Sequence, residues 1–150
     1  MANADLNCKA VDVVTYNMHG YKQGAAMLLE LSLSFDELLC QEHWLISDQL
    51  HKLNNMSDEF RNFSVSAMDE FCGKGVLRGC PFGGLGIFVR KSVCNNIQCL
   101  IKSDRVVAVK VDNCIFVCVY FPVFGRPYYR SSLWYSVSSV VCRLSVCRRL

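Results

Sequence analysis

The sequence has no acidic residue and no lysine after Asp112, and no histidine after His51. Any chemistry that needs a carboxylate or an imidazole must therefore use the first 112 residues. Five arginines give the stretch after Asp112 a formal charge of +5, whereas the first 112 residues carry 11 basic and 13 acidic residues, or −2. The basic character of the chain thus belongs to its C-terminal tail.

Long apolar runs are also missing. No segment reaches the roughly 18 uninterrupted apolar residues of a membrane-spanning helix, and residues 1–10 lack the basic and apolar regions of a secretory signal. The chain has 150 residues, of which 52% are hydrophobic and 19% charged, enough for one domain with a real core. We expect a soluble intracellular protein, nuclear or cytoplasmic, without a membrane partner.

The ten cysteines include no Cys-x-x-Cys pair, so the ligand spacing of a zinc site is absent. Several of them, such as Cys40, Cys114 and Cys118, lie within apolar runs, where a reduced cysteine behaves as a small hydrophobic residue. Free thiols are therefore favoured over a disulfide framework.

Short apolar, β-branched runs separated by turns dominate the chain, which predicts mainly strands. We expect strands over residues 11–16, 36–41, 63–68, 85–90, 97–101, 106–111 and 115–121. We expect helices over residues 25–33 and, with Ser47 as N-cap, over 48–53, and a glycine-rich loop over 69–84. Strand, helix and strand followed by antiparallel hairpins, one turning at Asp112 and Asn113, predict an α+β sandwich.

The predicted domain organisation has three parts: an N-terminal extension over residues 1–10, a domain over 11–124 and a basic tail over 125–150. The tail is either a basic amphipathic helix, for which its serine and β-branched content is poor, or sequence unrelated to the domain. Its arginines either face solvent or contact nucleic-acid phosphates.

Three polar constellations follow apolar strands: residues 16–20 (YNMHG), 41–44 (QEHW) and 120–122 (YFP). Strand ends are where functional groups gather on a rigid frame. Glu42 either points into water where its strand ends or binds Mg²⁺, which prefers oxygen ligands and phosphate oxygens. Asn17 would then orient the phosphate, and the Tyr120 hydroxyl would donate to developing negative charge. This chemistry suits hydrolysis of a phosphate ester.

The order of the motifs YNMHGY, CQEHWL, FGGLGIFVRK, DRVVAVKV and IFVCVYFP resembles that of the endonuclease/exonuclease/phosphatase superfamily over residues 11–122. It looks most like the apurinic-type endonuclease domain of non-LTR, LINE-like retrotransposons. The resemblance implies the N-terminal part of a four-layer α/β sandwich of the DNase I-like type that cuts DNA with Mg²⁺ or Mn²⁺. It also implies that Asn17 is the active-site asparagine, Glu42 the metal-binding glutamate and Tyr120 the phosphate-facing tyrosine.

The chain departs from that family in its second half, where the family has an Asp-x-Asn group and a C-terminal Asp-His pair that activates water. Because neither can lie after Asp112, we expect a truncated domain with little or no catalytic activity. For His19 and His43, local hydrogen bonding is favoured over substitution for the missing residues. A noncatalytic nucleic-acid-binding module and a phosphatase-type member are the alternatives. We also expect self-association through an uncovered sheet face.

Overall fold

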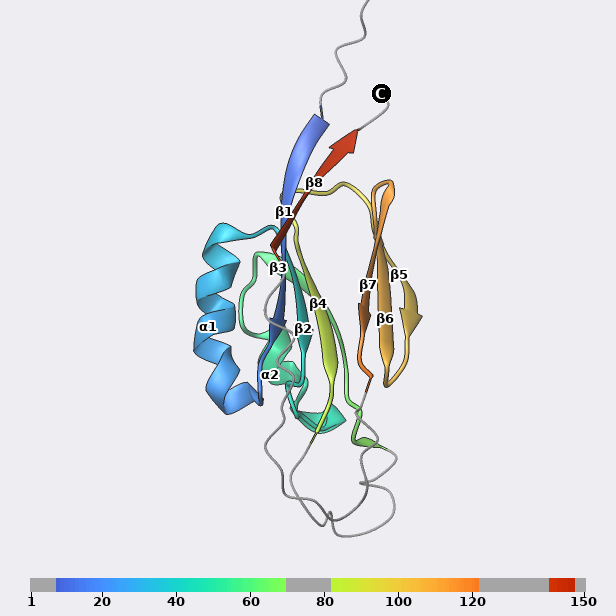
Figure 1. Ribbon diagram of the computed structural model, residues 1–150. Helices are drawn as coiled ribbons and strands as arrows, with labels where there is room; N and C mark the ends of the chain where they lie inside the picture. The colour runs from blue at the N-terminus through green and yellow to red at the C-terminus, as the bar shows by residue number, and fades with distance from the viewer. Residues whose placement is uncertain (1–7, 70–81, 122–140, 148–150) are drawn as a thin grey trace, which may run out of the picture.

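The computed structural model describes residues 8–69, 82–121 and 141–147. The helices are α1 (Tyr21–Ser34), the 3-10 helix η1 (Ser47–Gln49) and α2 (His51–Asn54). The strands are β1 (Cys8–Asn17), β2 (Glu37–Gln41), β3 (Phe60–Val65), β4 (Leu85–Arg90), β5 (Ile97–Lys102), β6 (Val106–Val111), β7 (Cys114–Val119) and β8 (Val141–Cys147). They form a five-stranded sheet, β3-β4-β2-β1-β8, and a three-stranded sheet, β5-β6-β7. Helix α1 covers one face of the larger sheet and the smaller sheet packs on the other (Figure 1).

The first three elements form a β1-α1-β2 unit in which the two strands are parallel and Asn17 lies opposite Gln41. Their carboxyl ends therefore share one edge of the sheet. Helix α1 begins at Tyr21, four residues earlier than expected. The expected loop over 21–24 is wrong, because these residues are helical. Gly24 is not a loop glycine: it lets the helix pack closely on the preceding loop, where a Cβ at position 24 would lie 2.7 Å from the Cβ of Met18.

Two apolar cores fill the spaces on either side of the larger sheet. Alternating side chains of β2 point to opposite faces, so Leu38 and Cys40 pack toward α1 while Leu39 packs toward the smaller sheet. Strand β4 is buried from Leu85 to Val89, as expected for a strand covered on both faces. The expected α/β sandwich is therefore observed, with helix, sheet and sheet as the layers that the described residues build.

Pairing moves the ends of two expected strands. The strand expected over 63–68 is observed as Phe60–Val65, because β3 pairs with β4 from Phe60 opposite Arg90 to Val65 opposite Leu85. The last hairpin turns at Asp112 as expected, with a positive φ of 50°, but β7 ends at Val119.

The predicted capping role of Ser47 is wrong. Ile46 precedes η1 in the N-cap position, and no side chain caps that helix. The Ser47 hydroxyl instead donates to Asp69 Oδ2 at 2.5 Å, and the Ser47 N–H donates to Oδ1 at 3.4 Å. The serine therefore anchors the chain that follows β3 rather than starting a helix.

The tail contributes a strand where a helix was one of two alternatives. Residues Val141–Cys147 run antiparallel to β1, with Val141 opposite Val14 and Cys147 opposite Cys8. The helical alternative is wrong for these residues because β1 offers them an open sheet edge, with which they pair along their whole length. Residues 125–140 of the tail lie outside the described ranges, and the domain limits stay a prediction. Within those ranges, no helix combines the length and the apolar character needed to cross a membrane.

Candidate functional site

The carboxyl ends of β1 and β2 and the residue after β7 bring the three predicted site residues to one rim. Gln41 makes this possible, since its side-chain amide donates to Thr15 Oγ1 on β1 at 2.9 Å and to Cys118 Sγ on β7 at 3.2 Å. Gln41, which precedes Glu42, is thereby bonded to β7, the strand that precedes Tyr120. We call Asn17, His19, Glu42 and Tyr120 the rim cluster.

Glu42 leaves the strand with a left-handed backbone, φ 57°. Its N–H donates to Gly84 O at 2.8 Å and its carbonyl accepts from Gly20 N–H at 2.8 Å, so β4 and the β1–α1 loop hold it on both sides. The side chain is only 13% exposed, which rules out the interpretation that Glu42 simply points into water. Its Oε2 is buried and has no hydrogen-bond partner in the described part of the chain.

Asn17 and His19 complete the near side of the rim cluster. Asn17 Oδ1 accepts from the His19 N–H at 3.0 Å, which fixes the loop that leaves β1. The His19 imidazole is half-exposed, at 42%, and its Nδ1 lies 3.7 Å from Glu42 Oε2. The structure thus places a histidine beside the predicted metal-binding carboxylate.

Tyr120 stands on the far side, where its N–H donates to Arg105 O at 3.0 Å. Burial raises the pKa of Tyr120, the negative charge of Glu42 raises it further, and the Arg105 guanidinium partly opposes both. The phenol therefore stays protonated at neutral pH and is available as a hydrogen-bond donor near the Glu42 carboxylate.

His43 is fully buried and has a structural role. Its Nδ1 accepts from the Leu45 N–H at 3.0 Å, so Nε2 carries the proton and donates to Val65 O at 2.9 Å. Burial lowers the His43 pKa to about 4. The expectation of local hydrogen bonding is confirmed for this residue. The double-glycine motif supports it, because a Cβ on Gly84 would overlap the imidazole ring.

Backbone strain gathers at the rim cluster. Of the four non-glycine residues with positive φ in the described ranges, His19 (47°) and Glu42 (57°) belong to the rim cluster, and Trp44 (58°) lies two residues after Glu42. Each such conformation costs of order 1–3 kcal/mol, and such residues concentrate at functional sites. Sequence patterns did not show this strain. The glycine at position 20 is explained by the fold, because a Cβ there would lie 2.6 Å from the Trp44 ring.

The residues present fit one kind of metal site and exclude another. No group of three or more His, Cys, Asp or Glu side chains converges on a metal position within the described ranges, which argues against a closed structural site there. The unpartnered Glu42 Oε2 offers one hard oxygen ligand. Mg²⁺ typically binds one or two carboxylates and completes its shell with waters and substrate phosphates, so a single carboxylate at an open rim fits it.

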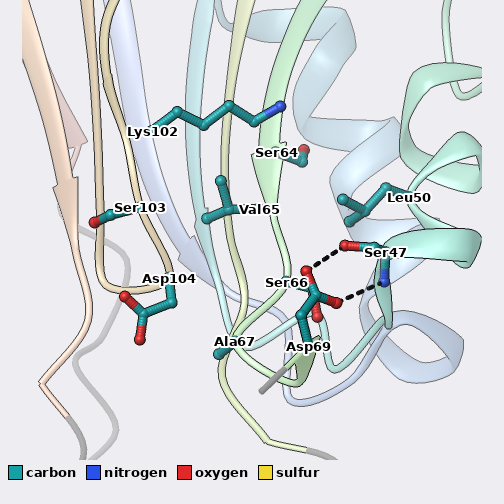
Figure 2. A pocket seen from close by; sticks show the side chains of 10 residues that line it. All are labelled: Ser47, Leu50, Ser64, Val65, Ser66, Ala67, Asp69, Lys102, Ser103 and Asp104. Atoms are coloured by element: carbon teal, nitrogen blue, oxygen red, sulfur yellow. Dashed lines mark hydrogen bonds between the residues drawn. The ribbon is translucent and has the colours of Figure 1, made fainter. Parts of the chain in front are cut away.

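A separate cleft of about 310 Å³ opens beside this rim, between β3, η1 and the β5–β6 turn (Figure 2). Its lining is mixed, with several serines and apolar side chains and with three charged residues, Lys102, Asp69 and Asp104. Two carboxylates against one ammonium make it unsuited to phosphate binding. Sequence patterns did not indicate this cleft, because Ser47 and Asp69 meet only in the folded chain.

The chain folds as part of a DNase I-like α/β sandwich, as expected. Its solved neighbours are endonuclease/exonuclease/phosphatase-type enzymes. The AP endonuclease LMAP from Leishmania major is 15% identical, with a TM-score of 0.53, over 75% of this chain and 40% of that one. The 3′ phosphatase NExo from Neisseria, bound to product DNA hairpin, is 18% identical, with a TM-score of 0.51, over 73% and 41%.

A third structure, the 3′-5′ exonuclease NExo from Neisseria meningitidis, is 18% identical with a TM-score of 0.50, over 73% of this chain and 41% of that one. At these identities the likeness shows the fold. The chain spans about two fifths of the length of these proteins. No protein-family model and no curated protein sequence matches it.

Proposed function

We propose that the chain is a partial DNA phosphodiesterase domain, derived from a non-LTR retrotransposon, that binds a divalent cation and DNA but hydrolyses DNA slowly or not at all. One observation carries the proposal: the buried, unpartnered Oε2 of Glu42 lies at the rim of a DNase I-like fold beside Asn17 and Tyr120. The motif order described above supports the retrotransposon origin.

Each rim residue has a role in this proposal. Glu42 would hold Mg²⁺ or Mn²⁺, which when bound supplies positive charge against a non-bridging phosphate oxygen. Asn17 fixes the loop beside the carboxylate and offers its amide N–H₂ to the phosphate. Tyr120, protonated at neutral pH, donates its O–H to the charge that develops on the phosphate.

We expect low activity because the part of the chain after Asp112 has no carboxylate or imidazole side chain. Hydrolysis needs a general base next to the attacking water, and no aspartate, glutamate or histidine follows Asp112. Loss of a general base typically costs about 10²- to 10⁴-fold in rate. We therefore expect binding without appreciable turnover.

The experiment is supercoiled-plasmid nicking by the purified chain in Mg²⁺ and in Mn²⁺, beside Glu42→Gln and an EDTA control. We expect nicking at the EDTA background, together with duplex binding that weakens steeply with salt. Nicking abolished by both Glu42→Gln and EDTA would support the site and contradict the predicted inactivity. Absence of both DNA binding and Glu42-dependent cation binding would overturn the proposal as a whole.

The second candidate is a phosphatase-type activity, because the described rim does not recognise a leaving group and one structural neighbour is named a 3′ phosphatase. A DNA hairpin with a 3′-phosphate separates the two. Phosphate release that Glu42→Gln abolishes, without plasmid nicking, would favour the phosphatase.

A further inference from the structure

His19 and Glu42 face each other from two segments that the backbone locks together. The Met18 N–H donates to Gln41 O, the Gly20 N–H to Glu42 O and the Tyr21 N–H to His43 O, each at 2.8 Å. Both side chains leave left-handed backbone positions between these bonds. Their mutual placement is therefore set by the backbone before any ligand arrives.

The distance between the two side chains has a specific meaning. His19 Nδ1 and Glu42 Oε2 lie 3.7 Å apart, beyond a hydrogen bond, and Oε2 has no hydrogen-bond partner among the described residues. Two neighbouring ligand atoms of an octahedral ion at about 2.1 Å stand about 3.0 Å from each other. The pair is therefore somewhat wider than two ligands of one ion, and a small rotation of the half-exposed imidazole toward the buried carboxylate oxygen would close the difference.

We propose that His19 Nδ1 and Glu42 Oε2 together bind one divalent ion, so that this site prefers Mn²⁺ to Mg²⁺. The inference rests on the proposed function, which places the cation on Glu42, and it adds a nitrogen ligand. Mg²⁺ favours an all-oxygen shell, whereas Mn²⁺, although it also favours oxygen ligands, is a first-row transition metal and accepts an imidazole nitrogen more readily than Mg²⁺ does. Ions later in the Irving–Williams order would bind this pair more tightly than Mn²⁺ does. Mn²⁺ is nevertheless the suitable probe, because it does not favour thiolates and the chain has ten cysteines.

The other two histidines provide the contrast. His43 uses both ring nitrogens on backbone groups inside the core. His51 is exposed, and its Nδ1 lies 2.7 Å from Asp48 O in the first turn of another helix. His51→Asn is therefore a matched control for His19→Asn. Asparagine also tolerates the left-handed backbone at position 19, so His19→Asn removes the imidazole with little added strain.

The test is Mn²⁺ binding followed by electron paramagnetic resonance, with electron spin-echo detection of nitrogen in protein labelled with ¹⁵N-histidine and kept reduced. We expect a histidine-nitrogen coupling on bound Mn²⁺ in the unmodified chain and in His51→Asn, and its loss in His19→Asn. Removing a group that merely orients a ligand costs about 10- to 100-fold in metal affinity, so losing a ligand should weaken Mn²⁺ binding about 10-fold or more. Competition with Mg²⁺ should show Mg²⁺ affinity unchanged within about 3-fold.

Three outcomes overturn the inference. Mn²⁺ that depends on Glu42 but shows no histidine nitrogen refutes the nitrogen ligand while the cation site of the proposed function stands. Equal losses of Mn²⁺ and Mg²⁺ affinity in His19→Asn, with native circular dichroism, would mean that the histidine only shapes the loop. Absence of Mn²⁺ binding altogether, read without any nuclease assay, refutes the inference and the cation site together.

Discussion

Glu37 is a buried carboxyl group without a hydrogen-bond partner for either oxygen in the described part of the chain. It lies in β2, and burial, with a smaller contribution from Asp36, raises its pKa from 4.5 to about 8. The folded protein therefore holds this group protonated at neutral pH. Below pH 4.5 both the folded and the unfolded chain bind this proton and folding loses nothing.

The first prediction concerns the pH dependence that Glu37 creates. As pH rises from 4.5 toward 8, only the unfolded chain ionises, so the free energy of unfolding falls. Glu37→Gln should remove this loss, and its stability relative to the unmodified chain should grow by about 3 kcal/mol between pH 4.5 and 7. Urea unfolding at both pH values measures it. A difference no larger than that of Glu30→Gln, on the exposed face of α1, would contradict it.

The second prediction concerns His43, whose burial holds its pKa at about 4. The folded chain keeps this ring neutral, so its contribution to stability is complete above pH 6.5 and is lost as pH falls toward 4. Nitrogen NMR of the histidine rings should show one ring that is neutral and protonated on Nε2 at pH 5.5. A charged His43 at that pH would contradict both the low pKa and the Leu45 hydrogen bond.

At the scale of elements, Arg90 joins three parts of the fold. From the end of β4 it pairs with Asp36 at 3.4 Å and Glu59 at 2.5 Å, and its guanidinium donates to the carbonyls of Ser32 and Phe35, where α1 ends. It also lies 4.6 Å from the centre of the Phe60 ring. Arg90 thus satisfies the open carbonyls of α1 while holding that helix to β3 and β4.

The third prediction follows from this placement. Arg90→Met should lower the free energy of unfolding by about 2–4 kcal/mol, since it leaves a carboxylate and helix carbonyls without their donor. Arg90→Lys should recover little, because a lysine cannot serve several acceptors with a planar fork. Denaturant unfolding measures both. Arg61→Met, an exposed arginine of the neighbouring β3, is the control, and equal losses in the two variants would refute the role.

The elements also show how far sequence patterns reach. Strands β4 and β6 were predictable because each is a short, mostly apolar run. That Asn17, Glu42 and Tyr120 would lie at one rim was predictable because strand ends meet at sheet edges, while their roles stay a prediction. The Ser47–Asp69 bond and the β8–β1 pairing were not, because both join segments distant in sequence. The approach of His19 to Glu42 was also invisible, because it depends on two left-handed backbone residues that no periodicity encodes.

At the scale of the whole molecule, the outer face of the smaller sheet is uncovered by the described residues. Its exposed apolar side chains are Ile101, Ile115 and Val117, with exposed fractions of 50%, 59% and 48%. Ile101 and Val117 lie in one row across the sheet, because each is paired with Ala108 of the central strand β6. An apolar sheet face with open edges favours association with other chains.

The fourth prediction is that the chain self-associates through this face. Replacing Ile115 and Val117 with threonine keeps the strand propensity and removes apolar surface. Sedimentation velocity should show this double variant shifted toward the monomer. Leu29→Thr with Leu33→Thr, on the exposed face of α1, is the matched control. A monomeric unmodified chain, or an equal shift in the control, would count against the prediction.

The pairing of β8 with β1 sets an order of events during synthesis. Cys8 stands opposite Cys147, so the first strand described receives its second neighbour from the last strand described. Until residue 147 has been made, β1 can pair on one side with β2 while its other edge displays free backbone groups to any passing strand. The strand that carries Asn17 into the rim cluster is therefore exposed to mispairing until then.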